Sequence, residues 1–213
     1  NNSFLGSEAG LANTTGNNNV FVGQKAGYST VSGGSNTAIG TSSAQNNVTG
    51  VQNTTVGHNS GIALNSYGNS LMGYRAGVAI TSGDMNTAMG VEAGIINTTG
   101  AANTMIGAFA DVSSSNLINA TAIGYNAKVA TSNSLVLGST GANAVNVGIN
   151  TTSPSYRLDV NASSIGNPIR LQGLLKSSTR PDSTLVYNAG AAGVVKNYGT
   201  AELTGFVYGT ATD

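Results

Sequence analysis

The chain has 213 residues, with eight basic and eight acidic side chains, a formal net charge of zero, and no Cys or Trp. Only 8% of its residues are charged, so there is no electrostatic basis for binding nucleic acid or an anionic membrane. The lack of Cys excludes disulfides and thiolate metal sites, and no apolar run is long enough to span a bilayer. Gly, Asn, Thr and Ser make up about half of the chain, which is typical of a disordered linker unless these residues recur in register.

They do recur in register, on a glycine that returns every 17 residues. The interval is 17 throughout, except for one of 16 between Gly57 and Gly73, and looser copies follow at Gly138 and Gly148. This regularity excludes a disordered linker for residues 1 to about 150. The repeat glycines are Gly6, Gly23, Gly40, Gly57, Gly73, Gly90, Gly107 and Gly124.

Each position of the repeat keeps its residue type when the copies are aligned on this glycine. The preceding residue is always apolar, the residue three positions after it is always small, and the residue four positions before it is Asn in the first seven copies. A second glycine closes many copies, usually after Thr or Ser. The Asn column comprises Asn2, Asn19, Asn36, Asn53, Asn69, Asn86 and Asn103.

These features predict an all-β fold. Seventeen residues are too few for two helices, but they hold two strands of about five residues and two tight turns. Such a coil buries its apolar side chains only by stacking on the next one. We therefore predict a β-solenoid, or β-roll, of about nine coils over residues 1–150. Stacked Asn side chains should form a ladder, and Glu8 should pair with Lys25, and Arg75 with Glu92, across neighbouring coils.

The alternation of side chains along each strand leads to a prediction about oligomerisation. We expect the apolar residue before the glycine, and the Thr, Ser or Val two positions earlier, to face inward. The residue between them then faces outward, and in five copies it is large and apolar. Exposed apolar patches usually mark interfaces, so we predict that these residues form the interface of a parallel homotrimer. The alternative is that the assignment of inward and outward positions is shifted by one residue, in which case these residues belong to the core. The five are Phe4, Phe21, Leu71, Met105 and Val136.

The repeats resemble those of known fibrous surface proteins. The segments 36–40 (NTAIG), 86–94 (NTAMGVEAG) and 97–100 (NTTG) are similar to repeats of trimeric autotransporter adhesin heads, the YadA-like β-rolls. They are still more similar to repeats of bacteriophage tail fibres and of related fibres in Bacteroidetes. Residues 147–160 (VGINTTSPSYRLDV) resemble a junction in those fibres, with Asn150 where the family usually has Gly. The resemblance implies a parallel homotrimer, exposed on a virion, on a phage-like particle or on a bacterial cell.

The period is lost after about Pro154. Short alternating segments separated by Gly, Ser, Pro and Asn predict a second β-rich module, a shaft or knob, over residues 151–213. Its expected strands lie at 157–160, 169–173, 185–187 and 193–196.

The sequence offers little for catalysis. His58 is the only imidazole, and we interpret it as an exposed turn residue. No nucleophile or phosphate-loop motif is present, and calcium-binding repeats would need more Asp. We therefore predict that the chain is not an enzyme and has no cofactor or metal site. Paired carboxylates from different chains are a remote alternative; they would come from Glu8, Asp84, Glu92 and Asp111.

Three functions follow from these observations. The first is a structural and attachment segment of a phage or phage-like tail fibre that binds a glycan or protein on a host surface. The second is a bacterial surface adhesin head or filament. The third, a binder of ice or polysaccharide, requires the Thr column to face outward on a flat sheet, whereas we expect it inside. Tyr74 and Tyr125, near turns, are possible receptor contacts.

Overall fold

The computed structural model describes residues 1–141 and 144–161 of the chain, which belong to one unit, Asn1–Asn161. Thirteen short strands lie in these ranges. They are β1 (Ser3–Leu5), β2 (Val20–Val22), β3 (Thr37–Ile39), β4 (Thr54–Val56), β5 (Ser70–Met72), β6 (Thr87–Met89), β7 (Thr104–Ile106), β8 (Asp111–Val112), β9 (Thr121–Ile123), β10 (Lys128–Val129), β11 (Leu135–Leu137), β12 (Val147–Ile149) and β13 (Leu158–Val160).

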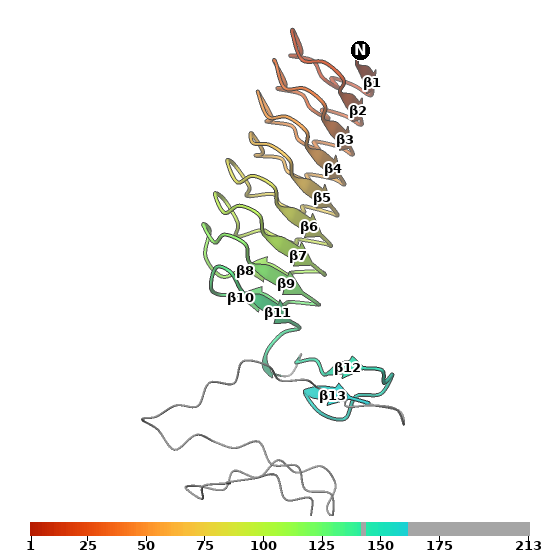
Figure 1. The fold of residues 1–213 in the computed structure, drawn as a ribbon. Coiled ribbons are helices and arrows are strands. Elements are labelled where there is room, and N and C mark those ends of the chain that lie inside the picture. The colour runs from red at the N-terminus through yellow and green to blue at the C-terminus, as the bar shows by residue number, and fades with distance from the viewer. Residues whose placement is uncertain (142–143, 162–213) are drawn as a thin grey trace, which may run out of the picture. The chain divides into compact units, whose positions relative to one another are not determined.

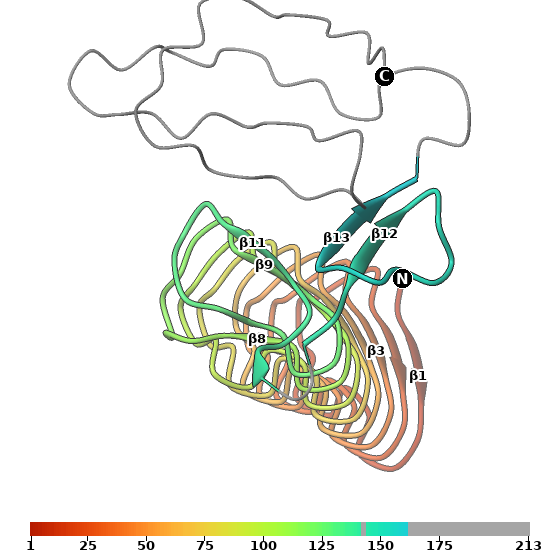
Figure 2. The same ribbon diagram turned by 90° about the horizontal axis from the view of Figure 1, so that it is seen from below.

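Nine of these strands form one parallel sheet in the order β1-β2-β3-β4-β5-β6-β7-β9-β11. Each repeat contributes one strand, and equivalent residues pair, so that Phe21 is opposite Ala38 and Ala38 is opposite Thr55. The coils follow one another along the stack in Figure 1 and lie nearly behind one another when viewed from below in Figure 2. The predicted β-solenoid with coils of about 17 residues is therefore confirmed.

The coils differ in one respect from the sequence prediction. Only one three-residue strand forms in each of the first six coils, and turns and bends make up the rest of the coil. A second short strand appears only in the seventh and eighth coils, where β8 pairs with β10. In earlier coils, the position of Asp111 is held by residues with positive φ, such as Gly77 and Gly94. Because Asp111 and Lys128 do not adopt that turn, the chain runs extended there.

The middle residue of each strand points into the coil. Phe21, Leu71 and Met105 are at most 1% exposed, and Val136 packs against the core cluster of Leu71 and Met105. Phe4, in the end coil, is 39% exposed and stacks on the Phe21 ring at 4.9 Å between centroids. The prediction that these five residues face outward and form a trimer interface is wrong, because they are packed within their own chain. The alternative is correct: the middle residue of each strand faces inward, and its two neighbours face outward.

Size compensation explains why this column is the core. Along the stack, large side chains neighbour small ones: Phe21 pairs with Ala38, Leu71 with Ala88, and Met105 with Ala122. Interiors pack to high density when large and small residues alternate across facing positions. The small residues three positions after each glycine complete this narrow interior, and Ala26, Ala76 and Ala93 are fully buried there.

The predicted Asn ladder is present and links the coils in two ways. Asn36 Oδ1 accepts the backbone N–H of Asn53 in the next coil at 3.0 Å, while Asn36 Nδ2 donates to the Gly50 carbonyl at 2.8 Å. The first bond joins residues 17 positions apart and the second joins residues 14 positions apart, so both link Asn36 to the next turn of the solenoid. The ladder continues to Asn103, whose Oδ1 accepts the N–H of Ala120. Because these amides are buried, their hydrogen bonds offset the cost of removing them from water.

Beyond the stack, β12 pairs in parallel with β13, with Val147 opposite Leu158. Strand β13 falls within the strand predicted at 157–160. The other three strands predicted for the module of residues 151–213 lie outside the described residues.

Candidate interaction surfaces

The outward face of the nine-stranded sheet is a regular surface that runs through every coil of the stack. Because the middle residue of each strand points inward, its two neighbours point outward and form two parallel columns. We call this surface the sheet face. Its Thr column comprises Ser3, Val20, Thr37, Thr54, Ser70, Thr87, Thr104, Thr121 and Leu135, and its aliphatic column comprises Leu5, Val22, Ile39, Val56, Met72, Met89, Ile106, Ile123 and Leu137.

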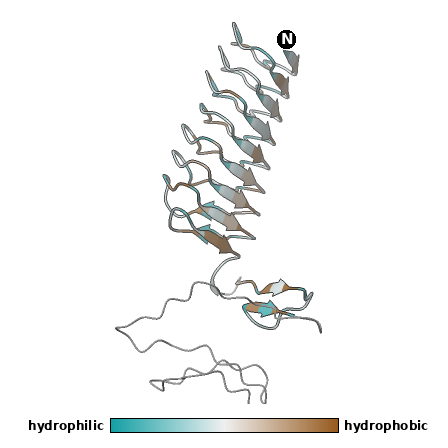
Figure 3. Ribbon diagram, in the orientation of Figure 1, coloured by the Kyte–Doolittle hydropathy of each residue, from teal (hydrophilic) through white to brown (hydrophobic). Residues whose placement is uncertain are grey.

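The sheet face is uncharged and substantially apolar. Ile39, Met72 and Met89 in its aliphatic column are 39%, 47% and 44% exposed. Neither column contains a charged residue, and Figure 3 shows pale and brown segments on the strands, as expected for Thr beside aliphatic residues. A contiguous uncharged surface of this kind is unusual for a chain that stays monomeric in water.

Sequence reasoning placed both columns inside because the aliphatic column is apolar in every copy. The structure places them outside, so the expectation of a buried Thr column is wrong. A signal for the true core was the alternation of large and small residues in the middle column from Leu71 to Val136, because a column packed within one chain must compensate for size from coil to coil.

A second surface runs along the corner where each strand ends. We call it the ridge, and it consists of the two residues that follow each repeat glycine. The second of the two has a left-handed backbone in every one of the eight main coils, for example φ of 55° at Arg75 and 53° at Glu92. Its N–H also bonds to the preceding coil, as from Glu92 to the Tyr74 carbonyl at 2.9 Å. The ridge therefore displays its side chains from a backbone fixed at every coil.

Both aromatic residues that the sequence suggested as receptor contacts lie on the ridge. Tyr74 is 48% exposed and Tyr125 is 57% exposed. They lie three coils apart and do not touch each other. Each has an aromatic neighbour: the Tyr74 ring stacks on His58 at 5.6 Å, and the Tyr125 ring meets Phe109 edge-on at 5.9 Å.

The ridge also carries ion pairs between coils, as predicted. Lys25 Nζ lies 3.6 Å from Glu8 Oε2, and the Arg75 guanidinium pairs with Glu92. These side chains are partly exposed, so each pair contributes at most about 1 kcal/mol, and the pairs mainly show that the register is regular.

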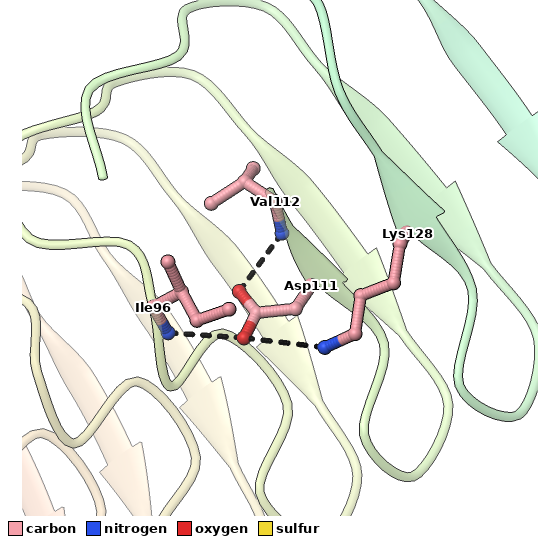
Figure 4. Close-up of polar contacts among 4 residues, drawn as sticks. All are labelled: Ile96, Asp111, Val112 and Lys128. Atoms are coloured by element: carbon pink, nitrogen blue, oxygen red, sulfur yellow. Dashed lines mark hydrogen bonds and ion pairs between the residues drawn. The ribbon is translucent and has the colours of Figure 1, made fainter. Parts of the chain in front are cut away.

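The four carboxylates considered for catalysis each have a partner within their own chain. Glu8 and Glu92 form the ion pairs just described, and Asp84 Oδ1 accepts the backbone N–H of Tyr67 at 3.0 Å. Asp111 is fully buried. Its carboxylate accepts N–H bonds from Val112 at 2.8 Å and from Ile96 at 3.0 Å, and it lies 3.7 Å from Lys128 Nζ (Figure 4).

Burial dominates the electrostatics of Asp111. It raises the pKa of the carboxyl above the ordinary value of 3.8, although the Lys128 charge and the backbone N–H groups act in the opposite direction. Ile96 lies in the sixth coil, which has one strand, whereas Asp111 lies in the seventh coil, which has the second strand β8. The hydrogen bond from Ile96 to Asp111 therefore joins two coils of different structure. No pattern in the sequence indicates this role, because the role depends on a change of coil type.

No three His, Asp or Glu side chains among residues 1–141 and 144–161 lie close enough together to hold a metal ion. His58 is exposed on the ridge. The same part of the chain contains no helix long and apolar enough to cross a membrane.

Comparison with known proteins gives no match: no family model, no curated protein and no solved structure is similar to this chain. Functional inference therefore rests on the residues and on the geometry of the sheet face and the ridge.

Proposed function

We propose that this chain is a structural and attachment segment of a trimeric surface fibre, exposed outside the cell on a phage or phage-like particle, where it contacts a host surface. The observation that carries the proposal is the uncharged sheet face, which runs through all nine strands of the stack. At a strand spacing of about 4.8 Å this face is roughly 40 Å long. It is long enough for several chains to associate side by side.

Three parallel copies would bury this face most simply. In a threefold ring the three sheet faces point toward a common axis and neighbouring chains make heterologous contacts. The aliphatic columns would then gather around this axis and form an apolar core between the chains. Regular backbone hydrogen bonds between coils then give a stiff rod. A bacterial surface adhesin head or filament would use the same trimer, and it remains the alternative carrier of such a segment.

The test of the fibre proposal is the mass of the particle in solution. Light scattering at micromolar concentration should give three times the chain mass of 21.1 kDa. A monomer at this concentration would overturn the proposal. Protease digestion of the same sample should leave residues 1–141 uncut, because backbone groups bonded between coils are not accessible to a protease.

A second candidate function, the binding of ice or of a crystalline polysaccharide, is favoured by one observation. The Thr column faces outward in the structure, with Thr54 exposed and Thr37 and Thr87 half-buried. This arrangement provides the outward Thr ladder that such binding requires. The two functions exclude each other on this face, because a trimer would cover the Thr column. A monomer that shows thermal hysteresis would support the second candidate, and a trimer without hysteresis would support the first.

A further inference from the structure

The ridge changes in character along the stack. In the first three coils the residue after the repeat glycine is Ser7, Gln24 or Thr41. From the fourth coil to the eighth, aromatic residues appear at both positions of the ridge. We call this part the aromatic stretch. It consists of residues 58–59, 74–75, 91–92, 108–109 and 125–126.

The aromatic side chains form two pairs separated by smaller residues. His58 and Tyr74 are stacked with 7° between their ring planes, which leaves the second face of the Tyr74 ring free of aromatic contact. Phe109 and Tyr125 are nearly perpendicular, at 88°. Between the two pairs, Val91 and Ala108 occupy the column of Tyr74 and Tyr125. The aromatic stretch therefore offers ring surface at both of its ends and less bulk in its middle.

Polar groups lie beside this aromatic surface, and their charges cancel. The Arg75 guanidinium pairs with the Glu92 carboxylate, and both side chains keep some exposure, 40% and 21%. Asn126 occupies the same column two coils beyond Glu92. Because Arg75 and Glu92 pair with each other, the aromatic stretch has hydrogen-bonding atoms but no net charge. Its charge distribution therefore suits a neutral ligand better than an anion or a cation.

We propose that the aromatic stretch binds a neutral oligosaccharide, with sugar rings packed against Tyr74 and Tyr125 and sugar hydroxyls bonded to Arg75, Glu92 and Asn126. The inference rests on the proposed attachment function and gives its ligand class. The apolar C–H face of a pyranose packs against the electron-rich face of an aromatic ring. Guanidinium, carboxylate and amide groups bond to hydroxyls. The backbone of the ridge is fixed by bonds between coils, which reduces the entropy lost on binding.

Peptide ligands fit this surface less well. A peptide that adds to a sheet needs an unpaired strand edge, whereas the N–H groups of Arg75, Glu92 and Phe109 bond to the preceding coil. A repeating sugar chain needs no such edge, and its successive rings have a spacing similar to the strand spacing of about 4.8 Å.

Calorimetric titration of the full chain tests the proposal. The probes are neutral hexasaccharides of glucose, galactose and N-acetylglucosamine, with their sulfated counterparts as anionic probes. At least one neutral probe should bind, and Tyr74→Ala should weaken it about tenfold or more, the scale of losing one stacking partner. Tyr67→Ala is the matched control, because Tyr67 is similarly exposed, at 41%, but contacts Met85 away from the ridge. It should change affinity less than about twofold.

Circular dichroism melts of each variant separate a loss of folding from a loss of binding, and Tyr125→Ala replaces Tyr74→Ala if the latter unfolds. The proposal is overturned if no neutral probe binds, if the sulfated probes bind more tightly, or if Tyr67→Ala loses as much affinity as Tyr74→Ala. Light scattering reports the trimer without any sugar present. Failure of sugar binding in a trimeric sample therefore refutes the ligand class alone, whereas a monomer refutes the fibre.

Discussion

The repeat glycine lies where the backbones of neighbouring coils approach closely, and it gives the first residue-scale prediction. Gly40 has φ of 128°, and a Cβ on it would lie 2.6 Å from the Gly57 carbonyl oxygen in the next coil. Gly40→Ala therefore combines a strained backbone with an overlap that no side-chain rotation relieves. We expect it to lower the free energy of unfolding by about 2 kcal/mol or more, measured by urea denaturation followed by circular dichroism.

The matched control is Gly68→Asn, at a glycine whose environment tolerates a side chain. Gly68 has φ of 69°, and the nearest atom to a new Cβ belongs to the Met85 side chain at 3.4 Å. Equivalent positions in other coils hold Asn18 and Gln52, both with φ of 58°. This change should alter stability by less than about 0.5 kcal/mol. Equal losses in the two variants would contradict the close-contact explanation.

Asp111 gives a second prediction, on pH dependence. Burial raises the pKa of its carboxyl above 3.8, so the folded chain holds this proton more tightly than the unfolded chain does. The stability that Asp111 contributes is therefore fully present below the unfolded pKa and is lost as pH rises through the folded pKa.

We expect the melting temperature of the native chain, relative to that of Asp111→Asn, to fall as pH rises from below 3.8 through this interval. Asn keeps one acceptor oxygen, for the N–H of Val112 or of Ile96, and does not titrate. The bond that it loses does not depend on pH, and the other ionisable groups cancel in the difference. Thermal melts at a series of pH values measure it. A difference that is constant with pH, or that rises with pH, would refute the raised pKa.

At the scale of elements, the Asn ladder is a side-chain link that repeats between neighbouring coils. Asn53 Oδ1 accepts the N–H of Asn69 at 3.0 Å, and Asn53 Nδ2 donates to the Ser66 carbonyl at 2.7 Å. Asn53→Ala leaves the buried N–H of Asn69 without a partner, whereas the Ser66 carbonyl still accepts the N–H of Val51 at 3.2 Å. We therefore expect a loss of about 1–3 kcal/mol. Denaturant unfolding measures this loss, and amide hydrogen exchange at Asn69 should become faster.

Asn47→Leu serves as the control for the ladder. Asn47 is also fully buried, but its Oδ1 has no hydrogen-bond partner among the described residues. Its Nδ2 donates only to the Gly50 carbonyl, which also accepts Asn36 Nδ2, and the next coil holds Leu64 at the same position of the repeat. Replacing this Asn by Leu should cost less than half of what Asn53→Ala costs. If the two substitutions destabilised the chain equally, burial rather than the ladder would explain the Asn column.

The coil and its links were predictable from sequence because they repeat. The glycine interval predicted the solenoid, the Asn column predicted the ladder, and alternating charges predicted the pair of Arg75 with Glu92. The facing of the strand was not predictable by the same means, since Ile39 and its equivalents are apolar in every copy although they are exposed. A column can be apolar because it is core or because it is an interface, and only packing within the coil separates the two. The exposure of Tyr74 and Tyr125 was predictable from their positions near turns. Their contacts with His58 and Phe109 were not, because these contacts depend on how neighbouring coils are aligned.

At the scale of the whole molecule, the fibre proposal predicts that one charge on the sheet face prevents assembly. In a threefold ring, Ile39→Lys brings three like charges toward a common axis and removes them from water, which disfavours the trimer but leaves the monomer folded. Ile39 is 39% exposed in the single chain, and so a lysine at this position is solvated before assembly. Light scattering should then give the mass of one chain, with an unchanged far-ultraviolet circular dichroism spectrum.

Val31→Lys is the matched control for this experiment. Val31 is 38% exposed, close to the value for Ile39, but it lies in a turn away from the sheet face. The same charge at this site stays in water in both the monomer and the trimer, so Val31→Lys should keep the mass of three chains. If both variants remained trimeric, another surface would hold the chains together. If both became monomeric, added charge rather than its position would be responsible, and the sheet face would lose its role as the interface.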